Sequence, residues 1–127
     1  MSGNIIIKCF INNYIEKEIF IVTWTVKVKY TRPNTDVAFY KAAANTYLNN
    51  SDQNHQTSTY KDTGKLISTS ASLSDNELEI IKTFVYKDEA SKDEHLSDSV
   101  IQTFRTADTE YNEDNDITRV ILQNEAT

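Results

Sequence analysis

The segment Val22-Thr-Trp-Thr-Val-Lys-Val-Lys-Tyr30 decides the fold class, because apolar and polar side chains alternate along it without a break. Valine, tryptophan and tyrosine fill one set of alternate positions, and threonine and lysine fill the other. A period of two is typical of a β-strand that buries one face. The sequence therefore predicts a strand whose apolar face needs cover from elsewhere in the chain and whose other face is more polar.

A first helix is predicted directly after this strand. Residues 32–36 combine a turn with a helix start, and apolar side chains recur at helical spacing from Val37 to Leu48. The stretch 49–63 that follows is almost wholly polar. We expect it to be a long connection.

Two further strands should form a hairpin. Residues 65–73 and 77–87 are both strand-like, and the second segment is the richer in β-branched and aromatic residues. The short polar sequence Ser74-Asp75-Asn76 lies between them. This arrangement predicts two antiparallel strands joined by a tight turn.

A second helix and a last strand complete the predicted order. Ser91-Lys-Asp-Glu94 fits a capping box, in which each side chain accepts a hydrogen bond from the other residue's backbone N–H. The helix should begin near Ser91, fade in the acidic stretch 108–116 and give way to a strand over residues 117–122. The order β-α-β-β-α-β predicts a ferredoxin-like α+β domain, with an antiparallel sheet and both helices on one face.

Composition and charge exclude several classes of function. A total of 13 basic against 19 acidic residues gives a net charge of −6, which disfavours contact with nucleic-acid phosphates. Two glycines are too few for a Gly-rich phosphate loop, and the single Cys9 excludes an intrachain disulfide. No apolar run is long enough to cross a membrane. We expect a cytoplasmic protein, or alternatively a virion protein, without cofactor, metal, nucleic-acid or membrane partner.

Residues 1–21 do not fit this plan and form an N-terminal extension to a domain of residues 22–127. Two alternatives stay open. In the first, residues 5–10 and 19–22 are strands with Asn12-Asn13 as their turn, and they add to a sheet edge or to a partner subunit. In the second, the extension is leader sequence translated in error, because its composition is what AT-rich DNA encodes, and Val22 is the true start.

The segment from Phe84 to Ile101 carries a family resemblance. An aromatic residue ends a strand, an alanine lies in an acidic turn, and a helix then carries a His-Leu pair, a small polar turn and an aliphatic residue. The residues that carry this pattern are Tyr86, Ala90, His95, Leu96 and Ile101. The segment resembles the dimeric α+β-barrel proteins of the antibiotic-biosynthesis monooxygenase family. The resemblance implies a homodimer with an apolar cavity beneath the helices.

Three departures from that family bear on the chemistry. Phe84 stands where many members have a glutamate, and Val100 stands where many have a second histidine. Phe104 or Arg105 occupies the region where the haem-degrading branch has its haem-ligating histidine. The family's catalytic groups are therefore not carried over, and no haem is expected.

His95 is the candidate for a proton-transferring group, because an imidazole titrates near neutral pH and suits a phenol or quinol substrate. The simpler interpretation is a boundary residue beside Glu94. The candidates for lining a ligand cavity are the aromatic residues Trp24, Tyr40, Phe84, Tyr86 and Phe104. Core packing is the favoured interpretation of the same aromatic residues.

Two functions therefore stay open. One is a dimeric protein that binds a small aromatic ligand, with cofactor-independent monooxygenase activity as its enzymatic form. The other is a non-enzymatic structural or interaction protein, for example a component of a viral particle. Whether the chain is an enzyme is uncertain, and the lack of convincing catalytic groups leans against it.

Overall fold

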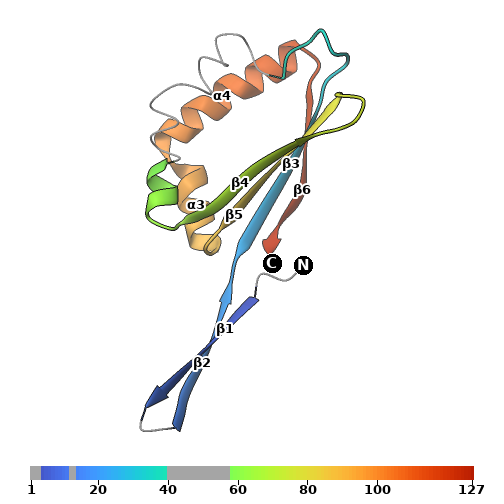
Figure 1. The fold of residues 1–127 in the computed structure, drawn as a ribbon. Coiled ribbons are helices and arrows are strands. Elements are labelled where there is room, and N and C mark those ends of the chain that lie inside the picture. Colours follow the sequence, from blue (N-terminus) through green and yellow to red (C-terminus); the bar gives the residue numbers. More distant parts are fainter. Residues whose placement is uncertain (1–3, 12–13, 40–57) are drawn as a thin grey trace.

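The computed structural model describes residues 4–11, 14–39 and 58–127, and its centre is a four-stranded antiparallel sheet. The strands, in their order across the sheet, are β4 (Leu66–Leu73), β5 (Glu79–Tyr86), β3 (Trp24–Thr31) and β6 (Thr118–Ala126). Two helices, α3 (Glu89–Ser97) and α4 (Ser99–Asp114), lie together on one face of the sheet (Figure 1). The chain thus has the ferredoxin-like α+β fold that the sequence predicts.

The alternating strand that decided the fold class lies at the centre of the sheet as β3. Its valines Val26 and Val28 are buried. They pack with Leu66 of β4, Tyr86 of β5 and Tyr60, which belongs to a short helical segment at residues 58–62. The core therefore lies between the helices and the end of the sheet where β4 and β5 meet β3.

The predicted hairpin of β4 and β5 is confirmed, with a longer turn than expected. Ser74 donates its backbone N–H to the Glu79 carbonyl at 2.9 Å, so the turn includes Glu77 and Leu78. Glu77 has a φ of 61°, in the left-handed region. The Asn76 side chain supports this turn by accepting the Leu78 N–H at 3.0 Å.

The first helix does not begin where the sequence predicts. Residues 33–39 form turns and bends. Asn34 Oδ1 accepts the Asp36 N–H at 3.0 Å, which closes a local turn instead of a helix cap. Arg32 donates to the Val37 carbonyl at 3.1 Å and so uses an acceptor that a helix would pair with its own backbone. The remainder of the predicted helix lies outside the described residues, as does the candidate residue Tyr40.

The second helix begins earlier than predicted, and the capping box is wrong. Asp88 is the N-cap of α3, and its Oδ1 accepts the Ser91 N–H at 2.8 Å. This hydrogen bonding to Ser91 is the main reason that the pKa of the Asp88 carboxyl is lowered. Ser91 is therefore inside the first turn, and Glu94 pairs with Lys65 at 2.8 Å instead of capping.

The predicted single helix is in fact two, separated at Asp98. This residue ends α3 and is the N-cap of α4, with extended backbone at φ −58° and ψ 131°. Its Oδ1 accepts the N–H groups of Val100 at 2.9 Å and Ile101 at 3.4 Å. The second helix does not fade at residue 108 but continues to Asp114. The acidic side chains are tolerated because Glu110, Glu113 and Asp114 point to solvent.

The face of the sheet opposite the helices is partly covered by the chain's last residue. Thr25 on this face of β3 and Thr23 just before the strand are buried. Thr23 donates to the Thr127 carbonyl at 2.9 Å, and the hydroxyls of Thr25 and Thr127 lie 2.6 Å apart. Lys27 and Lys29, further along the same face, stay half-buried.

The N-terminal extension forms a hairpin of two antiparallel strands, β1 (Asn4–Ile11) and β2 (Tyr14–Val22). Among the described strands these two pair only with each other, as a separate sheet. The hairpin projects beyond the start of β3 (Figure 1). Of the described helices, none is long and apolar enough to span a membrane.

Candidate functional site

The candidate site begins with a buried hydrogen bond between Tyr86 and His95. Tyr86 is the last residue of β5 and is 1% exposed, and His95 lies on α3 and is 5% exposed. The chain reverses at Lys87 and Asp88, so α3 runs back over the end of the strand. This places the Tyr86 hydroxyl 2.8 Å from His95 Nδ1. Tyr86 and His95, two of the five residues that carry the family resemblance, are therefore in direct contact.

Burial keeps both partners neutral. It lowers the pKa of the His95 imidazole, an effect opposed by the Asp98 carboxylate and reinforced by the Arg105 guanidinium. Burial also raises the pKa of the Tyr86 phenol, which Arg105 opposes. At neutral pH the site therefore holds an uncharged imidazole and an uncharged phenol.

The second ring nitrogen of His95 is unsatisfied. Within the described residues, Nε2 is buried and has no hydrogen-bond partner. Buried polar atoms in proteins are paired in the large majority of cases, with protein or with ordered water. The open Nε2 is therefore the feature of this site that most needs a functional explanation.

Tyr60 completes the aromatic surroundings of the imidazole, and sequence reasoning missed it. Its ring meets that of His95 edge to face, with centroids 4.9 Å apart and planes at 68°. The Tyr60 hydroxyl donates to the Glu94 carbonyl and to Asp98 Oδ2, each at 3.3 Å. The available signal was an aromatic residue within an otherwise polar segment, which is unusual unless the residue is buried.

The other predicted cavity residues lie at different places in the fold. Trp24 is half-buried, donates to Asn124 at 2.7 Å and has the Lys92 ammonium 5.1 Å from its ring centroid. Phe84 packs at the border of the core cluster, and Phe104 is buried on α4. Of the predicted aromatic set, Tyr86 is in contact with His95. That these residues line a cavity stays a prediction.

A second group of polar side chains lies between α4 and the sheet. Burial lowers the pKa of Lys82 and raises that of Asp108, and the charge of each opposes the shift of the other. Arg119 and Arg105 also lower the pKa of Asp108. This group therefore has three basic side chains and one acidic side chain, although the protein as a whole is acidic. The basic residues are Lys82, Arg105 and Arg119, and the acidic residue is Asp108.

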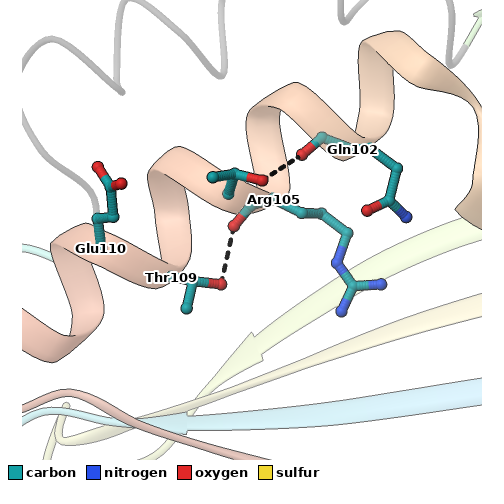
Figure 2. Close-up of a pocket in the computed structure, with 5 residues that line it drawn as sticks. Gln102, Arg105, Thr109 and Glu110 are labelled. Carbon is teal, nitrogen blue, oxygen red and sulfur yellow. Dashed lines mark hydrogen bonds between the residues drawn. The ribbon is translucent and has the colours of Figure 1, made fainter.

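A depression of about 400 Å³ follows one side of α4. Its lining residues are Gln102, Arg105, Thr106, Thr109 and Glu110 (Figure 2). Thr106 and Thr109 donate their hydroxyls to backbone carbonyls one turn earlier, at 3.0 and 2.8 Å. The threonine donors are thus used within the helix, and Arg105 is the charged donor of the wall.

No group of three or more His, Cys, Asp or Glu side chains suited to a metal ion occurs in the part of the chain that the structure describes.

Comparisons with known proteins show a likeness of structure but none of sequence. No family model matches the sequence, and no curated protein is significantly similar. The solved structure of Rv0793 from Mycobacterium tuberculosis is similar with a TM-score of 0.51, over 78% of this chain and 92% of that chain. The likeness is one of fold. At 14% sequence identity it supports the ferredoxin-like architecture and carries no information on activity.

Proposed function

We propose that this chain binds a small aromatic ligand between its helices and its sheet. The observation that carries the proposal is the buried His95 imidazole, bonded to Tyr86 on one side and open at Nε2 on the other. Ligand sites are typically apolar and aromatic, with a few placed polar groups that fix the orientation of the ligand. Tyr60, Tyr86 and His95 form such a set.

The resemblance to the antibiotic-biosynthesis monooxygenase family supports a homodimer as part of this proposal. The sheet face opposite the helices carries Lys27 and Lys29 on β3, which lie beside Thr83 and Ile81 on β5. All four side chains are half-buried. A face that is neither apolar nor freely solvated suits partial cover by the same face of a second copy.

An enzymatic form of the proposal assigns the proton transfer to His95. In it, Nε2 takes the proton of a bound phenol or quinol, and dioxygen is the oxidant. The lowered pKa keeps the imidazole neutral at neutral pH, and in this form its one proton is on Nδ1, so the Nε2 lone pair is free to accept another. The Tyr86 hydroxyl would orient the ring through Nδ1.

Binding of 1-naphthol, followed by the fluorescence of the protein's single tryptophan, tests the ligand site. We expect saturable binding and a loss of about tenfold in affinity for His95→Ala, since one buried hydrogen bond contributes about 1 kcal/mol or more. The exposed Ser97→Ala on the same helix serves as the control and should bind like the wild type. A folded His95→Ala with unchanged affinity would contradict the proposal, and oxygen uptake with quinols checks the enzymatic form.

A structural or interaction role is the second candidate, and the β1–β2 hairpin favours it. A two-stranded hairpin is at best marginally stable in water unless it packs against another surface. This one pairs with no other described strand. Light scattering on the full chain and on a variant lacking residues 1–21 separates the candidates, because an assembly role through the hairpin requires the shortened chain to lose its larger oligomers.

A further inference from the structure

The β1–β2 hairpin has apolar positions on both of its faces. Its register pairs residues 5–7, all isoleucine, with residues 19–21, which are isoleucine, phenylalanine and isoleucine. Consecutive residues of a strand belong to opposite faces, so the end of the hairpin next to β3 is apolar on both. Strands with continuous apolar runs are typical of sheets that are covered on both faces. The hairpin therefore has the sequence of a covered element.

The edge strand β6 has an exposed apolar run of the same kind. Val120, Ile121 and Leu122 are 49%, 51% and 47% exposed. Val120 pairs with Lys29 and Ile121 with the buried Val28, so these two side chains lie on opposite faces of the sheet. The free side of β6 pairs with no other described strand. An exposed apolar edge strand is a template for pairing with another chain unless something covers it.

The other edge of the sheet lacks this character. Half of the eight residues of β4 are serine or threonine. The sequence of β6 contains neither lysine nor proline, two residues that natural proteins place on edge strands to prevent pairing. Of the two edges, β6 is therefore the one that suits an added strand.

The hairpin and the β6 edge match each other but are separate within one copy. The hairpin strands have 8 and 9 residues, and β6 has 9. The hairpin strands carry two basic and two acidic residues and β6 carries one of each, so neither element adds net charge. In one copy they belong to different sheets, and the hairpin projects beyond the start of β3 (Figure 1). The partner that offers the matching element is a second copy of this chain.

We infer that the β1–β2 hairpin of each copy pairs with the β6 edge of a second copy, so that two copies exchange hairpins. Reciprocal exchange covers both hairpins and both edges in one closed dimer, and exchange of an identical element is a low-cost route to dimers. The inference rests on the second candidate function, the interaction role of the hairpin, and names its surface. It does not depend on the ligand site at His95.

Cross-linking between two different chains tests the contact directly. Cys9 in β1 is the single cysteine of the chain and so marks the hairpin. The wild type is co-expressed with a tagged full-length chain that carries Cys9→Ser and Ile121→Cys, and a flexible bismaleimide is added. We expect a cross-linked species that contains both chains. Leu73→Cys in place of Ile121→Cys is the matched control, because Leu73 is 49% exposed on the other edge strand, and it should cross-link no more than the same mixture in urea.

A charge on the edge should weaken the dimer. Ile121→Lys is expected to raise its dissociation constant by at least about tenfold, since a lysine on an edge strand opposes pairing. Leu73→Lys makes the same change on β4 at nearly equal exposure and should leave the constant unchanged. Light scattering over a dilution series measures the constant, and circular dichroism checks that both variants are folded.

Contrary results separate this inference from the role on which it rests. A monomeric full chain, or a chain lacking residues 1–21 that keeps the wild-type oligomers, would overturn the interaction role and this inference together. If that deletion abolishes the oligomers but Ile121→Cys cross-links no more than Leu73→Cys, the interaction role stands and β6 is not its surface. Binding of 1-naphthol tests the ligand site separately.

Discussion

Replacement of Tyr86 by alanine is expected to lower the free energy of unfolding by about 3–5 kcal/mol, the range for truncating a buried aromatic side chain. Tyr86 is among the two most completely buried large side chains described, and it packs with Val26 and Leu66 at the centre of the core cluster. Such a loss is a large share of the total stability of a domain of this size. Urea unfolding followed by far-UV circular dichroism measures it.

The variant Tyr86→Phe separates the hydrogen bond from the packing. It keeps the ring and removes the hydroxyl, which leaves His95 Nδ1 without its partner, so we expect a loss of about 1–2 kcal/mol. Tyr111→Phe is the matched control, because the Tyr111 hydroxyl donates to the Ala38 carbonyl at an exposed site. Its effect should stay within about 0.5 kcal/mol. Equal stability of Tyr86→Phe and wild type would contradict the buried bond to His95.

Replacement of Asp98 by alanine is expected to lower the free energy of unfolding by about 2 kcal/mol, at the upper end of the range for lost N-caps. The carboxylate caps α4 through Val100 and Ile101 and accepts the Tyr60 hydroxyl through its other oxygen. Its loss thus weakens both the helix junction and the aromatic wall of the site. Urea unfolding of the variant checks this value.

Two further variants show whether the cap is the cause. Asp98→Asn keeps an acceptor oxygen for the helix N–H groups and should recover about half of the loss. Asp114→Ala, which removes an exposed carboxylate from the last turn of α4, should be neutral or slightly stabilising. A loss as large for Asp114→Ala as for Asp98→Ala would contradict the assignment of Asp98 as the cap that joins the two helices.

The sheet was predictable from the sequence because its signals are local. The alternation in β3 and the polar turn between β4 and β5 are each readable within about ten residues, and the structure contains both the strand and the hairpin. The helix boundaries were harder to predict, because several neighbouring polar side chains could each have served as the N-cap of a helix. Asp88 took the capping position that Ser91 was expected to occupy, and Asp98 caps a second helix that was not predicted.

The site was only half predictable. Tyr86 and His95 were noticed through the family pattern, but their contact depends on the reversal at Asp88, which the sequence does not specify. Tyr60 reaches His95 from a distant segment of the chain, and that contact depends on tertiary packing. The charge excess around Arg105 involves residues on α4, β5 and β6 that are brought together only by folding.

The central claim is that His95 is buried and neutral, with Nδ1 bonded to Tyr86 and Nε2 open. An NMR titration of the imidazole nitrogens, assigned with a His95→Gln variant, tests it most directly. Because burial lowers the pKa of His95, the account predicts an imidazole that stays neutral as the pH falls through 6.5 and protonates only below it. An imidazole that titrates at 6.5 as in a free peptide would contradict the account.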